Sequence, residues 1–262
     1  MPATDNSGDA DGTVGLVVAF IVLTVLTLVA SNVWLAWRSY GKEIALAQES
    51  SRNIAHAVSQ QFDSLFSDVD RALETITFQI ERGDMSPSAI QELQPLLVNI
   101  LSRSDHLQSL FVFDRDGYSI INTQPTRPST LRANDRPYFV AHQASPSMQT
   151  LVGRPLEARS TGVHIIPVSR RINDFDGRFA GVVLASVRID YVVGMLEGFE
   201  VGEEGAIALM LNDGAILARR PFSAADLQRS LADSPIFTEQ PAVRLGALSM
   251  VDRKSTRLNS SH

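Results

Sequence analysis

Hydrophobic and polar positions along the chain fall into three successive patterns. Residues 14–37 carry no charge over 24 positions, which is an apolar run long enough to cross a bilayer as a helix. Residues 38–82 then repeat apolar or small side chains at spacings of three and four, which indicates a long helix with one apolar stripe. After that helix, short apolar runs alternate with turn residues, as strands and hairpins do. The pattern therefore predicts a transmembrane helix, a stalk helix and an α+β region.

The apolar run is interpreted as a retained membrane anchor. A cleaved signal peptide has a basic segment before a shorter apolar core, whereas three Asp and no Lys or Arg precede this run. Trp34 and Trp37 lie at its end, where indole rings favour the membrane interface. Arg38 and Lys42 follow it, and the positive-inside rule applied to these two residues alone places the N-terminus outside.

The apolar stripe of the stalk leaves two interpretations open. It can pair with a second chain as a coiled coil, or it can pack against its own domain. The two are compatible if the half near the membrane forms a homodimer and the distal half covers a sheet. The preceding residues 1–13 are rich in Gly, Asp and Ser, a composition typical of disorder.

Residues 83–199 predict one α+β domain with about five antiparallel strands. A helix over 85–105, with Ser86 as its N-cap and Pro95 as a kink, is followed by a hairpin over 107–123 that turns at "DRDG". Three further strands are expected within 148–158, 162–172 and 177–189, and a short helix over 190–199 ends the unit.

Residues 200–252 predict the truncated start of a second, similar domain. The stretch "EGAIALMLNDGAILARRP" repeats the strand, Asp-Gly turn and strand of the first hairpin. Residues 253–262, "RKSTRLNSSH", abandon every earlier pattern and resemble a translated sequencing-adapter tail. We treat this tail as foreign and expect the natural protein to continue beyond residue 252.

Composition and motifs narrow the function classes. A net charge of −6 and a pI near 5.4 argue against a nucleic-acid partner. The absence of cysteine excludes disulfides, thiolate catalysis and Cys-ligated metal sites. No catalytic motif is present and the five histidines show no metal-ligand spacing, so we expect this chain to hold no cofactor or metal and to catalyse nothing.

The stretch "NDRPYFVAH", residues 134–142, holds the densest group of side chains that could bind a ligand. Asp135 suits the N-cap of a helix and Pro137 its first turn. On the strand "HIIPVSRRI", alternation places Ser169 and Arg171 on one face and Arg170 on the other. An inward arginine beside the helix offers a fork for a carboxylate ligand. The alternative is structural pairing of an arginine with a nearby aspartate; the pairs considered join Arg136 or Arg171 to Asp135, Asp174 or Asp176.

Four stretches together resemble the double Cache (PDC, PAS-like) extracytoplasmic sensor family. They are "DRPYFVAH", "VGRPLEARSTG", "PVSRRINDFDGRFAGVVLASVRIDY" and "VGEEGAIALMLNDGAILARRP", and the resemblance covers about residues 14–252. It implies a bacterial inner-membrane protein with its N-terminus inside and its sensor domain outside. It also implies a membrane-distal PAS-like domain, a membrane-proximal one and a cytoplasmic output domain.

The resemblance also implies a ligand site. Arg136, Tyr138 and Phe139 resemble the R-x-[WY]-[YF] element of amino-acid-binding Cache domains, in which the arginine side grips the ligand carboxylate. Ser186 stands where those domains hold the ligand amine with an aspartate, which favours a small carboxylate without an amine, or an empty pocket. The predicted ligand-binding residues are Arg136, Tyr138, Phe139, His142, Ser169, Arg171 and Ser186.

The function implied is a membrane-anchored sensor that signals to an output domain outside this chain. A diguanylate cyclase of the GGDEF type is the first expectation for that domain. The alternatives are a histidine kinase, a chemoreceptor, or a dimerising scaffold that binds no ligand.

Overall fold

A computed structural model describes residues 8–83, 87–124, 131–202, 205–223, 227 and 229–232. The chain divides into two compact units, residues 1–53 with 249–262 and residues 54–248. The predicted foreign tail, 253–262, the Ser86 cap and most of the second half of the partial domain lie outside the described residues.

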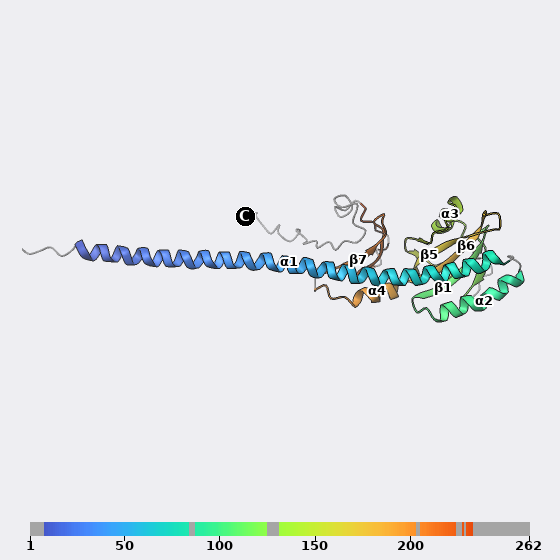
Figure 1. The fold of residues 1–262 in the computed structure, drawn as a ribbon, viewed down its shortest axis with the longest axis horizontal. Coiled ribbons are helices and arrows are strands. Elements are labelled where there is room, and N and C mark those ends of the chain that lie inside the picture. Colours follow the sequence, from blue (N-terminus) through green and yellow to red (C-terminus); the bar gives the residue numbers. More distant parts are fainter. Residues whose placement is uncertain are drawn as a thin grey trace, which may run out of the picture. The chain divides into compact units, whose positions relative to one another are not determined.

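The described part of the first unit is the beginning of helix α1 (Gly8–Arg82) (Figure 1). This helix includes residues 8–13, within the segment predicted to be disordered, because a helix extends at low cost once it has nucleated. Phe20, Trp34 and Trp37 are among its exposed apolar side chains. In the described part of the chain, no helix combines the length and the apolar character needed to cross a membrane. The span over residues 14–37 stays a prediction.

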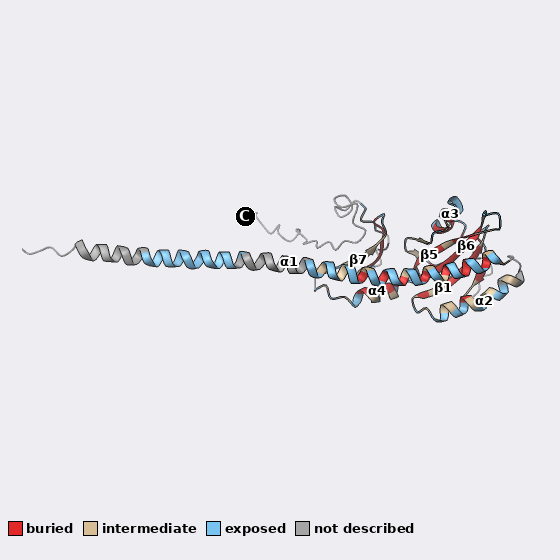
Figure 2. Ribbon diagram, in the orientation of Figure 1, coloured by how far each residue is buried: buried red, intermediate tan, exposed pale blue. Residues whose placement is uncertain are grey.

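In the second unit, the remaining part of α1 packs its apolar stripe on its own domain. Burial follows the helical spacing, as the red positions on α1 in Figure 2 show. This confirms packing against the chain's own sheet for the distal half, while pairing of the other half with a second chain stays a prediction. The buried stripe comprises Val58, Phe62, Leu65, Val69, Leu73, Ile76 and Ile80.

Helix α2 (Pro87–Ser102) lies on the same side of the sheet as α1. It continues through Pro95 and is tied to the sheet by Gln94, whose side-chain amide donates to the Asn122 carbonyl over 2.9 Å. The predicted helix over 85–105 is therefore confirmed, with shorter bounds.

The sheet is antiparallel and has six strands in the order β2-β1-β6-β5-β3, with β4 also paired to β5. Sequence alternation on β1 sends Leu110 and Val112 to the core under α1 and α2, and Phe111 and Phe113 to a second core on the other face. Helix α3 (Pro137–Ala144) covers that second face, and α4 (Ile189–Glu197) follows β6. The strands are β1 (Leu107–Asp114), β2 (Ser119–Asn122), β3 (Leu151–Val152), β4 (Leu156–Glu157), β5 (His164–Asn173) and β6 (Phe179–Arg188).

The predicted turn chemistry at "DRDG" is confirmed. The Asp114 carboxylate accepts from the backbone amides of Asp116 and Tyr118 over 3.0 and 2.8 Å. Gly117 has a φ of +85°, and a Cβ there would lie 2.6 Å from the Asn134 nitrogen. The Gly117 carbonyl instead accepts from the Ala133 amide over 2.9 Å. The hairpin thus fixes the segment that leads into α3.

The predicted restart of the pattern is also confirmed as a hairpin. Strands β7 (Ile207–Met210) and β8 (Ile216–Arg220) pair antiparallel around Gly214, which has a φ of +79°. The Asp213 carboxylate accepts from the Ala215 amide over 3.0 Å, as Asp114 does in the first hairpin.

Candidate ligand-binding site

The start of α3 differs in one detail from the prediction. Arg136 is the N-cap residue, with extended backbone angles (φ −74°, ψ 140°), and Pro137 occupies the first turn as expected. No side chain caps the helix, so the prediction of Asp135 as the cap is wrong. The Asp135 carboxylate instead binds the Arg159 guanidinium, with one Nη1–Oδ1 distance of 2.8 Å. A two-point, charge-assisted contact of this kind is stronger than a single bond to a backbone amide.

A small cavity of about 30 Å³ lies between the α3 segment and the sheet. Its floor is apolar and includes Phe111, Phe113 and Leu184 from β1 and β6. No acidic residue is found among the described residues that line it. Its polar lining residues are Arg132, Arg136, Tyr138, Arg159, Ser160 and Ser186.

The three arginines at this cavity differ in what already holds them. Arg159 is neutralised by Asp135, and it also donates to the Arg132 carbonyl over 2.6 Å. Arg132 lies over the Tyr118 ring at 4.7 Å. Arg136 donates to the Glu157 carbonyl over 2.9 Å and makes no ion pair with a carboxylate of the described residues. Arg132 and Arg136 therefore both have charge to offer an anion, and Arg136 is the less exposed of the two.

Two pKa shifts describe the electrostatics of this site. The hydrogen bond from Arg159 lowers the pKa of Asp135 to about 2. This pair therefore contributes its full stability above the ordinary carboxyl range near pH ~4, and the contribution is lost as the pH falls toward ~2. Burial raises the pKa of Tyr138, so its phenol stays protonated and can donate a hydrogen bond at the cavity.

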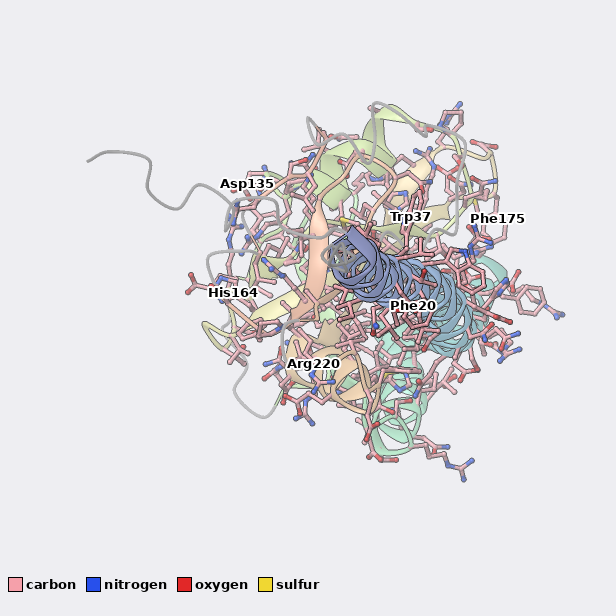
Figure 3. The ribbon with its side chains drawn as sticks, turned by 90° about the vertical axis from the view of Figure 1, so that its left-hand side faces the viewer. Phe20, Trp37, Asp135, His164, Phe175 and Arg220 are labelled. Carbon is pink, nitrogen blue, oxygen red and sulfur yellow. The ribbon has the colours of Figure 1, made fainter. Side chains whose placement is uncertain are left out.

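Figure 3 shows Asp135 at the edge of the molecule, on the side opposite Phe175 in this view.

His142, Ser169 and Arg171 form a separate buried cluster and do not line the cavity. The His142 Nε2 and Ser169 Oγ atoms lie 3.0 Å apart, and burial lowers the pKa of His142. Arg171 donates to the carbonyls of His142 and Ser145, the latter over 3.0 Å. It makes no ion pair with a described residue. The cluster ties the C-terminal end of α3 to β5.

Of the seven predicted site residues, the cavity brings together Arg136, Tyr138 and Ser186. Phe139 packs edge-on against the Phe179 ring, with centroids 5.3 Å apart, and lies outside the cavity lining. The alternative of pairing Arg136 or Arg171 with Asp135, Asp174 or Asp176 is wrong for these described residues. The aspartates pair with other arginines.

Sequence reasoning missed Arg132 and Arg159. Both lie on loops, one before the helix and one between β4 and β5, and 27 residues separate them. Loop residues have no periodicity that reveals where their side chains point. The sequence signal for Arg159 is that it is the second arginine of "VGRPLEARSTG", one of the stretches that carry the family resemblance.

An antiparallel sheet with a long N-terminal helix on one face and a short helix over a cavity on the other defines a PAS-like sensor domain. A family model described as "Cache domain" matches residues 43–259, and the chain belongs to this family. The matched range ends at residue 259, within the tail 253–262 that the sequence pattern predicts to be foreign.

One curated relative is the methyl-accepting chemotaxis protein TlpA of Bacillus subtilis. It is 20% identical over 205 residues, which are 78% of this chain. The chain spans only 30% of the length of that chemotaxis protein.

Three solved structures show the same fold. The extracellular domain of rpHK1S-Z16, named as a candidate histidine kinase, is 29% identical with a TM-score of 0.63 over 75% of this chain and 80% of that one. The domain of the Pseudomonas fluorescens chemoreceptor CtaA with L-isoleucine is 19% identical, TM-score 0.58, over 71% and 72%. The domain of Pseudomonas aeruginosa PctC with GABA is 17% identical, TM-score 0.56, over 72% and 82%.

Proposed function

We propose that this chain is the sensor part of a membrane receptor and binds a small carboxylate between α3 and the sheet. The observation that carries the proposal is the Arg136 guanidinium, which lines a cavity without acidic lining residues and has no carboxylate partner of its own among the described residues. A planar guanidinium binds a carboxylate in a two-point contact. Tyr138, held protonated by burial, supplies a further donor.

The size of the cavity requires that a ligand open it. A volume of about 30 Å³ has room for roughly one water molecule. The exposed Asp135–Arg159 pair joins the segment before α3 to the loop after β4, so it is the contact that must yield. A ligand carboxylate can replace Asp135 on Arg159 and release this segment.

The lining of the cavity favours a carboxylate without an amine. CtaA and PctC were solved with L-isoleucine and GABA, which both carry an amine as well as a carboxylate. An ammonium group needs an anion or several acceptors when it leaves water. Ser186 stands on β6 at this cavity, and its hydroxyl cannot neutralise a positive charge. We therefore propose a short carboxylic or hydroxycarboxylic acid.

Adjacent residues of β5 provide a route from this site to α1. Arg171 donates hydrogen bonds to the C-terminal end of α3. The preceding residue, Arg170, points to the opposite face of the sheet because side chains alternate along a strand. There Arg170 contacts Asp70 and Glu74 of α1, at 3.3 and 3.5 Å. A displacement of α3 therefore pulls on a strand that is bonded directly to the long helix.

The remaining parts of the receptor are extensions of this proposal. The uncharged run over 14–37 would anchor the chain in a bacterial inner membrane, with the sensor domain outside and a homodimer through the stalk. The output domain would be a diguanylate cyclase, and the described domain would bind rather than catalyse. The likeness to a chemotaxis protein and to a candidate histidine kinase supports those two outputs as alternatives.

A thermal-shift panel tests the proposal on the full chain. Propionate, lactate and pyruvate are compared with L-isoleucine, L-serine and isobutylamine, each at saturating concentration. We expect a carboxylate to raise the Tm by several degrees, since a ligand at a hundred times its Kd adds about 2.7 kcal/mol. Stabilisation by amino acids alone would show that the site holds an amine. No stabilisation by any compound would favour the ligand-free scaffold.

Removing the competing carboxylate is expected to tighten binding. In Asp135→Asn the Arg159 guanidinium loses its charged partner and becomes available to the ligand. Because the pair is exposed and screened, we expect a gain in carboxylate affinity of only about threefold. Titration calorimetry measures it, with Asp176→Asn, which breaks the exposed pair with Arg178, as the matched control. An unchanged or weaker affinity would contradict the role given to Asp135.

Breaking the contact between β5 and α1 is expected to separate binding from its transmission. Arg170→Gln removes the ion pairs to Asp70 and Glu74 but leaves the cavity lining intact. Carboxylate affinity should stay within about twofold, the size of a weak surface interaction. Hydrogen exchange should show ligand-dependent protection of α1 around residue 70 in the wild type and none in the variant. Equal protection in both would place the route elsewhere.

A further inference from the structure

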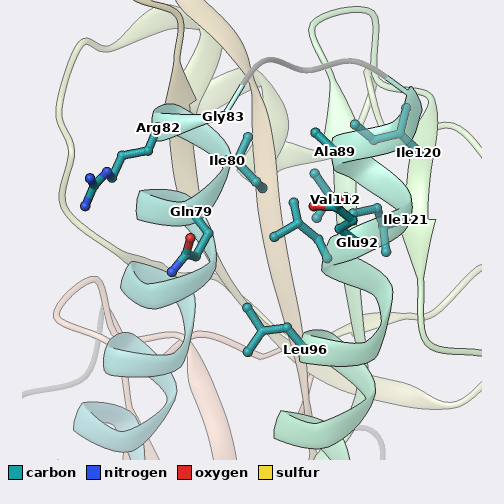
Figure 4. Close-up of a pocket in the computed structure, with 11 residues that line it drawn as sticks. Gln79, Ile80, Arg82, Gly83, Ala89, Glu92, Leu96, Val112, Ile120 and Ile121 are labelled. Atoms are coloured by element: carbon teal, nitrogen blue, oxygen red, sulfur yellow. The ribbon is translucent and has the colours of Figure 1, made fainter.

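A larger cavity of about 390 Å³ lies on the opposite face of the sheet from the carboxylate site (Figure 4). It is bounded by the end of α1, by α2 and by strands β1 and β2. Its wall on β1 is Val112, whereas the carboxylate site is lined by Phe111 and Phe113 of the same strand. Strand alternation therefore keeps the two cavities on separate faces.

The walls of this cavity suit an apolar body. Ile80 comes from α1, Leu93 and Leu96 from α2, and Ile120 and Ile121 from β2. The volume lies within the range of about 300–1,000 Å³ that is typical of small-molecule sites. A compact aromatic or branched aliphatic group fits such a space.

Two features bring negative charge to this cavity, the Glu92 carboxylate and the C-terminus of α1. Glu92 points from α2 toward the space between the helices, and it forms no ion pair with any described residue (Figure 4). The cavity also borders the C-terminus of α1, where the Gly83 amide bonds back to the Gln79 carbonyl. The last carbonyls of a helix carry the negative end of its dipole.

Arg82 is the one cation among the described residues that line this cavity, and its side chain points away from it. Arg82 points away from α2 (Figure 4), and its guanidinium lies over the Phe78 ring at 5.1 Å. Its charge is therefore directed away from the cavity, and the Glu92 carboxylate is left facing the apolar space.

We propose that this cavity is a second ligand site, which binds a small organic cation with an apolar body, such as a primary arylalkylamine. The ammonium group would sit between Glu92 and the end of α1, with the apolar body against Ile80, Leu93 and Ile121. A ligand there contacts α1 and α2 at once and so biases their separation. The inference does not depend on the carboxylate site, which lies on the other face.

Calorimetric titration of the full chain in lipid nanodiscs tests the proposal, with empty nanodiscs as the blank. The probes are phenethylammonium, its neutral alcohol analogue and phenylacetate. We expect phenethylammonium to bind at least about threefold tighter than the alcohol, with phenylacetate weakest, as an exposed charge pair provides. Glu92→Gln should abolish this preference, whereas Glu49→Gln, on an exposed carboxylate of α1 outside the cavity, should leave it unchanged.

A second pair of variants distinguishes the two sites. Leu96→Trp fills the apolar space and should remove binding of phenethylammonium and of its alcohol analogue, whereas Arg136→Ala should leave phenethylammonium binding unchanged. Equal affinity for the amine and the alcohol would overturn the proposal, and so would an amine preference that survives Glu92→Gln. Crosslinks from residue 92 to a second copy of the chain, with no probe bound, would show that another protomer covers the cavity and would equally overturn it.

Discussion

Replacing Arg136 by alanine is expected to weaken binding of a small carboxylate by at least about tenfold. A hydrogen bond to a charged group contributes roughly 1.5–3 kcal/mol, and each 1.4 kcal/mol is a factor of ten in Kd. Arg159 is bound to Asp135, whereas neither Arg132 nor Arg136 has a carboxylate partner among the described residues. Arg132 is exposed and lies over the Tyr118 ring, whereas Arg136 is partly buried at the start of α3, so its loss removes the less solvated charge available to the ligand.

Titration of the variant with the carboxylate found by the thermal-shift panel measures this effect. Arg115→Ala is the matched control, because Arg115 is exposed at the first hairpin and lies outside the cavity lining. It should bind within about twofold of the wild type. A wild-type affinity in Arg136→Ala would move the carboxylate site away from α3 and would leave the Cache fold without an assigned ligand here.

The strand faces were predictable because alternation is a property of the backbone. Ser169 and Arg171 were expected on one side of β5 and Arg170 on the other, and the contacts follow this division: Arg171 reaches α3 and Arg170 reaches α1. The first hairpin was predictable for a local reason too, since Asp114 satisfies amides only two and four residues away.

One strand was predicted as continuous and is interrupted. Residues 148–158 form two separate two-residue strands, β3 and β4, on either side of Gly153. Their partner β5 contains Pro167, which has no amide hydrogen to donate to a ladder. The Gly153 amide donates to the Pro167 carbonyl over 2.8 Å, and a Cβ at this glycine would lie 2.9 Å from the proline ring. The interruption between β3 and β4 depends on how these residues pair with β5, and the sequence of residues 148–158 alone contains no information about that partner strand.

The site was only partly predictable because its charges come from loops. Arg136 and Tyr138 could be found within one motif, but Arg159 reaches them through a tertiary contact with Asp135. That contact also changed the role of Asp135 from helix cap to ion-pair partner. His142 was predicted as a ligand residue from its position in the same motif; its Nε2 lies 3.0 Å from the Ser169 Oγ and it does not line the cavity, and its role in binding stays a prediction.

Replacing Arg171 by methionine is expected to lower the free energy of unfolding of the sensor domain by about 3 kcal/mol. Arg171 is only 5% exposed. Its guanidinium donates hydrogen bonds to the His142 and Ser145 carbonyls and, over 2.6 Å, to the Asn173 side-chain oxygen. A buried acceptor left without its donor costs about 1–3 kcal/mol. Methionine fills much of the volume but donates nothing, and part of the cost is offset because a buried charge is also removed.

Urea denaturation followed by circular dichroism measures this change, with Arg178→Met as the matched control. Arg178 precedes the neighbouring strand, its side chain is 78% exposed, and its one ion pair among the described residues is with Asp176, so its loss should cost little. Binding provides a second readout that depends on the end of α3. If the cluster positions α3 over the cavity, Arg171→Met should also weaken the carboxylate at urea concentrations where the domain is still folded. A stable variant with unchanged affinity would show that α3 is held by Phe139 and its apolar contacts alone.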